Sequence, residues 1–171
     1  GTIDFQNTLA KNGCTADIVL AGTNTLLFAC RAVQPGHVHV SGQKNDILVS
    51  AYPSRKNDIV LAAIQQYLPE YRMVPDILSV SLDNLNFEFH PGPTLLYTAM
   101  IENGLDFEYY SDFTPSQARL IEAIDQERLA LCRAYGIPVR NVAQTFHDEY
   151  GYEGTLYEMI KHADVYKGIK G

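Results

Sequence analysis

The sequence has 171 residues, of which 46% are hydrophobic and 19% are charged, and its formal net charge is −7. This composition is that of a soluble globular protein, long enough for one domain or for one domain with part of another. The acidic balance and the scattered lysines and arginines argue against a nucleic-acid surface, and no apolar run reaches the roughly 20 residues of a membrane span.

The three cysteines, at positions 14, 30 and 132, are odd in number and widely spaced. This set fits neither a disulfide framework nor a zinc site, so we expect a reducing, cytoplasmic setting. No signal-peptide pattern opens the sequence, which begins at Gly1.

Residues 1–53 are predicted to be mostly β-structure. A short apolar run at residues 17–21 is typical of a buried strand, and residues 37–41 alternate with period two. A further apolar run follows at residues 47–51. We expect the last two runs to pair as an antiparallel hairpin across a short loop.

A helix is expected from Ser54, a candidate N-cap, to Pro69, and residues 73–75 are expected to form a connector. Beyond Asp76 nothing has a strand pattern. We therefore predict an α+β chain in two parts. Residues 1–75 form the β-rich end of a dinucleotide-binding α/β domain, and residues 76–171 form an all-helical substrate-binding and catalytic domain.

The second part reads as a series of helices. Thr114, Pro115 and Gln117 occupy the N-cap, N1 and N3 positions of a capping box, and Gly136 stands where that helix ends. We expect its inward face to consist of Ala118, Ile121, Ile124, Leu131 and Tyr135. Four further helices are expected at residues 76–89, 94–103 (closed by Gly104), 137–150 and 155–162, the last burying Leu156, Met159 and Ile160.

Two polar residues lie among large apolar ones at the end of the first of these helices. Asn86 and His90 are four residues apart, so their side chains share one helix face. Pro91 disfavours the α conformation at His90, and we expect Pro91-Gly92-Pro93 to halt the regular backbone. The pair could be reactive, or His90 could simply cap loose carbonyls at a helix end.

The other polar candidates are given structural interpretations. His37 and His39 share one strand face, which we expect to be solvated. Cys30 is expected to be a small buried hydrophobe rather than a nucleophile. Asp125 and Arg128 can pair at i, i+3, for a few tenths of a kcal/mol. Four carboxylates that could include a general acid or base are expected to be solvated on helix surfaces: Glu88, Glu102, Asp106 and Glu108.

Neither GxGxxG nor GxxxxGK[ST] occurs in the sequence. Four segments, in matching order and spacing, resemble the opine dehydrogenases of the octopine/nopaline type. The most specific are Asn86 to His90-Pro91 and the downstream Ile-Asp-x-Glu-Arg element at residues 124–128. The other two are residues 25–31 (Thr-Leu-Leu-Phe-Ala-Cys-Arg) and residues 42–44 (Gly-Gln-Lys).

The resemblance implies a two-domain enzyme that joins the amino group of an amino acid to an α-keto acid such as pyruvate and reduces the imine with NADH or NADPH. It implies that His90 transfers the proton at the keto carbon and that Asn86 helps to shape the site. It also implies that Thr25 and Cys30 lie near the amino-acid substrate. A homodimer is possible.

Three features depart from the family pattern. This sequence has no glycine-rich phosphate loop, so no cofactor-binding residue is assigned in it. It ends before the Arg-Tyr and Glu-Asp-x-Pro elements that supply the aspartate partner of the histidine. Asn24 stands where an acidic residue is frequent, which disfavours a guanidinium substrate.

We therefore expect the chain alone to be inactive. The alternative function is a non-catalytic helical interaction or dimerisation module. A ketoacid reductase or 3-hydroxyacid dehydrogenase is disfavoured, because no lysine lies between Lys56 and Lys161.

Overall fold

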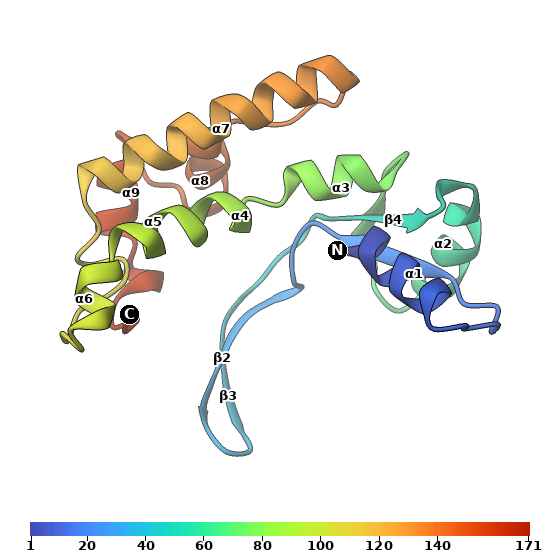
Figure 1. Cartoon of the computed structure of the whole chain (residues 1–171), viewed down its shortest axis with the longest axis horizontal. Coiled ribbons are helices and arrows are strands. Elements are labelled where there is room, and N and C mark those ends of the chain that lie inside the picture. The colour runs from blue at the N-terminus through green and yellow to red at the C-terminus, as the bar shows by residue number, and fades with distance from the viewer. The chain divides into compact units, whose positions relative to one another are not determined.

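The computed structural model describes residues 1–40 and 42–171 in full and the strand backbone at position 41. The chain forms two compact units, Gly1–Asn84 and Leu85–Gly171. The first contains the strands and the second is helical (Figure 1), which confirms the predicted order of a β-containing part followed by helices. The predicted domain boundary at residues 75/76 stays a prediction.

A small mixed sheet is the centre of the first unit. Its order is β1-β4-β5, with β1 (Leu20–Thr23) antiparallel to β4 (Ile47–Tyr52) and β5 (Tyr71–Met73) parallel to β4. Val49 and Ala51 of β4 are buried in its core. The segment expected to be a connector at 73–75 therefore begins within a strand.

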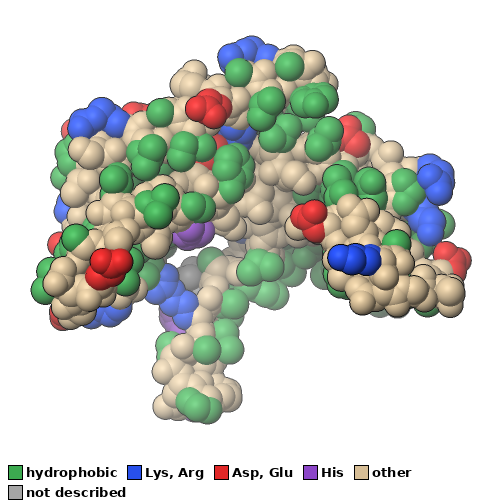
Figure 2. All heavy atoms as spheres, viewed as in Figure 1, with side chains coloured by type: hydrophobic (Ala, Val, Ile, Leu, Met, Phe, Trp, Pro, Cys, Tyr) green, Lys and Arg blue, Asp and Glu red, His purple; other side chains and the backbone are tan. Residues whose placement is uncertain are grey.

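A separate two-stranded hairpin is formed by β2 (Phe28–Gln34) and β3 (His37–Gln43). Gly36 has φ 79°, which lets the two-residue loop Pro35-Gly36 reverse the chain at once. The predicted pairing of residues 37–41 with 47–51 is wrong, because this tight turn gives β3 an earlier partner. Figure 2 shows hydrophobic side chains along the hairpin, where Val33, Val38 and Val40 are exposed.

Helices flank the sheet of the first unit. The chain begins with α1 (Thr2–Lys11), which the prediction of mostly β-structure missed. Ser54 is not an N-cap but opens the 3₁₀ turn η1 (Ser54–Lys56). The helix α2 (Asn57–Ile64) begins after it and ends before Pro69. The Asn57 side chain accepts from the Ala51 amide at 2.7 Å, which ties the helix start to β4.

The helix expected at residues 76–89 is two helices. The first, α3 (Ile77–Asp83), is capped by Asp76 and packs on the sheet through Ile77 and Val80. Asn84 has ψ 110° and interrupts the helix. The second unit then opens with α4 (Asn86–Phe89) and α5 (Pro91–Leu96), followed by α6 (Thr98–Glu102).

The longest helix of the second unit is α7 (Pro115–Tyr135). Its Thr114 capping box and its left-handed Gly136 C-cap are confirmed. The expected inward face is wrong at its C-terminal end, because Leu131 and Tyr135 are exposed by 51% and 64%. Asp125, Arg128 and Cys132 are buried in their place.

Two further helices complete the core of the second unit. The helix expected at residues 137–150 begins later, as α8 (Val142–Tyr150) with Asn141 as N-cap. The last, α9 (Leu156–His162), buries Leu156, Met159 and Ile160 as predicted, and the 3₁₀ turn η2 (Asp164–Tyr166) follows. Among the fully described positions, no helix combines the length and apolar composition that a membrane crossing requires.

Candidate active site

His90 stands at the joint between two short helices, as the C-cap of α4 and the N-cap of α5. Its φ of −105° and ψ of −57° lie in the right-handed helical region, so the expectation that Pro91 would expel it from that region is wrong. Pro91 and Pro93 do not halt the backbone either. They occupy the first turn of α5, a part of the helix where proline is well tolerated.

Asn86 lies one helical turn before His90. The His90 amide donates to the Asn86 carbonyl at 3.1 Å, so the predicted i, i+4 relation holds in the backbone. Both residues are solvent-exposed. Partial desolvation still lowers the pKa of His90 below its ordinary value of 6.5, which favours the neutral imidazole at neutral pH.

Tyr109 is a neighbour of His90 that the sequence did not point to. Its hydroxyl lies 3.0 Å from the His90 carbonyl oxygen and 3.2 Å from that of Phe89. Its ring centroid is 6.4 Å from that of His90. The Tyr109 backbone carbonyl accepts from the Tyr97 hydroxyl at 2.9 Å. The joint that bears His90 therefore rests on an aromatic support.

Glu88 corrects the expectation of a solvated carboxylate. Its side chain is 0% exposed, and its Oε1 lies 2.8 Å from Nε of Arg128 on α7. Neither Glu88 oxygen accepts a well-aligned hydrogen bond from the fully described residues. Burial therefore outweighs the attraction of Arg128 and raises the pKa of Glu88 to about 7.

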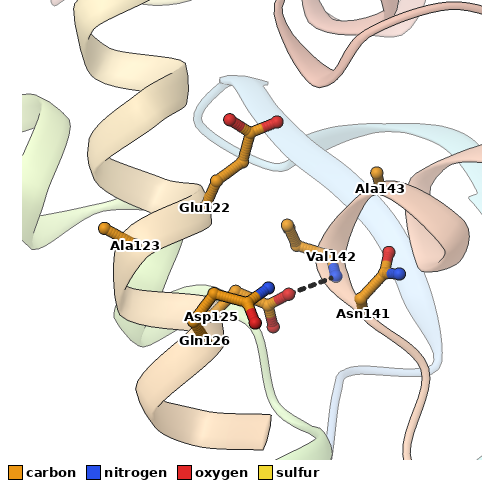
Figure 3. Close-up of a pocket in the computed structure, with 7 residues that line it drawn as sticks. All are labelled: Glu122, Ala123, Asp125, Gln126, Asn141, Val142 and Ala143. Atoms are coloured by element: carbon orange, nitrogen blue, oxygen red, sulfur yellow. Dashed lines mark hydrogen bonds between the residues drawn. The ribbon is translucent and has the colours of Figure 1, made fainter.

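Arg128 and Asp125 extend this buried cluster. Arg128 donates to Asp125 Oδ1 at 3.0 Å through Nε and to the Arg140 carbonyl at 2.6 Å. The other Asp125 oxygen accepts from the Val142 amide at the start of α8 (Figure 3), at 3.0 Å. The predicted i, i+3 pair of Asp125 and Arg128 is present. It is buried, and these side chains connect α4, α7 and α8 out of contact with water.

The pocket in Figure 3 is lined in part by Asp125 of this cluster. Its lining combines α7 residues with the N-terminal residues of α8, among them Glu122, Gln126 and Asn141. Neither Asn86 nor His90 lines it. It is therefore not the site predicted around His90.

The remaining predicted residues belong to the first unit or to surfaces. Thr25 is half-buried beside β1, and Cys30 on β2 is exposed rather than buried. His37 and His39 are exposed, as predicted. Of the other carboxylates, Glu102 and Asp106 are exposed and Glu108 is half-buried. No group of three or more metal-binding side chains occurs in the part of the chain described in full.

Comparison with known proteins decides the family. A family model described as the alpha-helical domain of NAD/NADP octopine/nopaline dehydrogenase matches residues 73–171. The chain belongs to the octopine/nopaline dehydrogenase family. The matched region includes the Asn86–His90 turn and the buried cluster of Glu88, Asp125 and Arg128.

Two curated proteins are similar in sequence to this chain. Opine dehydrogenase of Arthrobacter sp. (strain 1C) is 35% identical over 173 residues, which cover 100% of this chain and 48% of that protein. Vitopine synthase of Allorhizobium ampelinum is 25% identical over 153 residues, covering 88% and 42%. The chain thus spans about half the length of the curated relatives it matches.

Solved structures of two dehydrogenases share the fold of this chain. Octopine dehydrogenase with NADH and L-arginine superposes with a TM-score of 0.70 at 20% identity, over 99% of this chain and 47% of that chain. Apo yersinopine dehydrogenase superposes with a TM-score of 0.61 at 13% identity, over 99% and 49%. At these identities the likeness shows the arrangement of the backbone.

Proposed function

We propose that this chain forms the substrate-binding and proton-transferring part of an NAD(P)-dependent opine dehydrogenase. The amino group of an amino acid condenses with the carbonyl of an α-keto acid, such as pyruvate, and releases water. The resulting imine gains one proton and one hydride to give a secondary amine. The observation that carries the proposal is the exposed His90, held one helical turn after Asn86 within the region that matches the family's helical domain.

His90 is assigned the proton transfer in this reaction. Loss of water from the condensing carbon requires a donated proton, and the attacking amine must lose one. An imidazole that titrates near neutral pH can perform both steps. The lowered pKa of His90 keeps it largely neutral before substrate binds, which suits it to accept the first proton.

Asn86 is assigned the orientation of the keto acid, because its exposed amide lies on the same turn as His90 and can donate to an oxygen. Thr25 and Cys30 are assigned contacts with the amino-acid substrate. Thr25 stands in the segment between β1 and β2, and Cys30 exposes its thiol on β2.

The amino-acid substrate is proposed to lack a guanidinium group. Asn24 is neutral, and both the amide nitrogen and the oxygen of its side chain already form hydrogen bonds. Its Nδ2 donates to Asp83 at 2.7 Å and its Oδ1 accepts from the Leu48 amide at 3.0 Å. Octopine dehydrogenase has been solved with arginine and with agmatine. A substrate with a neutral side chain fits the carboxamide at position 24 better.

The hydride of the reduction comes from the nicotinamide cofactor in this class of enzyme. Dinucleotide phosphates are bound by a glycine-rich turn at a helix N-terminus. No GxGxxG occurs in this sequence, so the residues present do not fit the phosphates. We assign cofactor binding to the part of the relatives that this chain does not span, and we expect the chain alone to be inactive.

The test replaces His90 by alanine in the complete gene product that contains this chain. Oxidation of NADH or NADPH is followed with pyruvate and a panel of neutral and cationic amino acids. We expect the His90→Ala rate to fall at least about 100-fold, the lower range for general acid–base catalysis. His162→Ala is the control, because His162 is exposed on α9. Equal rates in the two variants would show that His90 is structural.

A further inference from the structure

Two prolines remove hydrogen-bond donors from the joint that bears His90. In a helix the N–H of residue i+4 bonds to the carbonyl of residue i. Phe89 would therefore accept from residue 93, but Pro93 has no N–H. The His90 carbonyl keeps its helical donor, the Thr94 amide, at 3.1 Å. The Phe89 carbonyl therefore needs a hydrogen-bond donor from outside the backbone of the joint.

The Tyr109 hydroxyl occupies that place. It lies 3.2 Å from the Phe89 carbonyl oxygen, 3.0 Å from the His90 carbonyl oxygen and 3.0 Å from Oγ1 of Thr94. One hydroxyl proton can be shared between the two carbonyls, while the Thr94 hydroxyl donates to the Tyr109 oxygen. Burial raises the pKa of Tyr109, so this hydroxyl keeps its proton at neutral pH.

Tyr109 is itself fixed on the opposite side. Its amide donates to the Ile169 carbonyl at 2.7 Å, next to an isolated antiparallel bridge between Glu108 and Lys170. Its carbonyl accepts from Tyr97, and its ring contacts the Tyr97 and Tyr110 rings at centroid distances of 5.4 and 5.0 Å. The hydroxyl therefore acts from a rigid base.

We propose that Tyr109 is a positioning residue for His90. The Tyr109 hydroxyl replaces the N–H that Pro93 lacks and so fixes the joint between α4 and α5. The catalytic meaning of this assignment rests on the proposed role of His90. The role of Tyr109 in the joint itself does not.

The first experiment uses NMR on the full chain and does not depend on activity. Tyr109→Phe removes the hydroxyl and keeps the ring. We expect the His90 imidazole resonances to shift and the Thr94 amide to exchange with solvent about fivefold faster, as one lost hydrogen bond allows. Tyr166→Phe is the control, because it removes a hydroxyl that bonds Tyr150 in the same unit. Unchanged His90 and Thr94 signals in Tyr109→Phe, or the same changes in Tyr166→Phe, would overturn the assignment.

The second experiment is a rescue in the complete gene product. We expect Tyr109→Phe to lower kcat about tenfold or more while KM for the dinucleotide stays unchanged, because small displacements of a reacting group are costly. Pro93→Ala restores an N–H that can reach Phe89, so Tyr109→Phe/Pro93→Ala should recover activity relative to Tyr109→Phe. No recovery, or no fall in kcat, would overturn the positioning role. If Tyr109→Phe gives the expected NMR changes but His90→Ala keeps full activity, the proposed function would be overturned instead.

Discussion

Glu88 and Arg128 form a charge contact of 2.8 Å between α4 and α7, and both side chains are out of reach of solvent. A buried carboxylate beside one guanidinium that is shared with Asp125 is only partly compensated. Because Glu88 is two residues from His90, the energetics of this contact bear directly on the turn that carries the candidate site.

Glu88 should make stability depend on pH. Its folded pKa of about 7 exceeds the ordinary 4.5, so the folded state binds the proton more tightly than the unfolded state. The stabilisation that comes from protonated Glu88 is fully present below pH 4.5 and is lost as the pH rises towards 7. We expect a loss of a few kcal/mol, at about 1.4 kcal/mol per pKa unit. Urea denaturation between pH 4.5 and 8 measures it.

Glu88→Gln provides the matched variant, since it keeps the shape and removes the ionisation. We expect it to be at least as stable as the unsubstituted protein at pH 8 and to lack the fall between pH 4.5 and 7. Glu127→Gln, at an exposed position on α7, should leave the profile unchanged. A Glu88→Gln protein that is markedly less stable at pH 8 would mean that the ionised pair is net stabilising.

Removal of Arg128 should be far more damaging than removal of an exposed arginine. Arg128→Met leaves Glu88 and Asp125 buried without their cation, and such a change typically costs about 3–5 kcal/mol. Arg133→Met, on the exposed side of the same helix, should cost no more than about 0.5 kcal/mol. Denaturant unfolding of both variants makes the comparison. A loss below about 1 kcal/mol for Arg128→Met would contradict a tightly closed cluster.

His90 and His147 should titrate on opposite sides of the ordinary value of 6.5. Desolvation lowers the pKa of His90, whereas a hydrogen bond to the Tyr152 carbonyl at 2.9 Å raises that of His147. NMR titration of the imidazole carbons separates the two residues in one sample. If His90 still has the lower pKa in Tyr109→Phe, its desolvation does not depend on the Tyr109 hydroxyl. A pKa of His90 above that of His147 in the unsubstituted chain would refute the burial argument.

Gly92 should tolerate replacement by alanine but not by valine. A Cβ at this position would lie 3.0 Å from the terminal Cδ2 of Leu120 and 3.5 Å from Cδ1 of Ile124. The flexible Leu120 methyl can yield, and alanine is favoured over glycine inside a helix, so Gly92→Ala should be close to neutral. Gly92→Val overpacks the contact between α5 and α7 and should cost about 1–3 kcal/mol. Thermal unfolding of the pair tests this, and equal losses would argue against close packing here.

The features predicted best from the sequence are those that depend on residues within one helical turn. The Thr114 capping box, the Gly136 cap and the Thr155 helix start are correct because each depends on hydrogen bonds between residues three or four apart. The i, i+4 backbone relation of Asn86 and His90 is of the same kind. The proposed role of this segment rests on family resemblance and is tested by the variants above.

What the sequence missed depends on contacts between distant residues. Glu88 and Arg128 are 40 positions apart, so nothing near Glu88 marks it as buried. Tyr109 reaches the joint from 19 positions away, although the missing N–H of Pro93 was a readable signal that Phe89 needs another donor. The strand pairing failed for a different reason, because the tight turn at Pro35-Gly36 pairs β3 with β2 rather than with β4.

The span of these contacts along the chain has a consequence for folding. Two hydrogen bonds join α7 to the start of α8 and to the residue two positions before it, from Asp125 to Val142 and from Arg128 to Arg140. They close short loops and can form early. The Glu88–Arg128 contact and the Tyr109–Ile169 hydrogen bond close longer loops. We therefore expect the His90 amide to gain protection late in pulse-labelled refolding, after the α7 and α8 amides, so that the candidate site is assembled last.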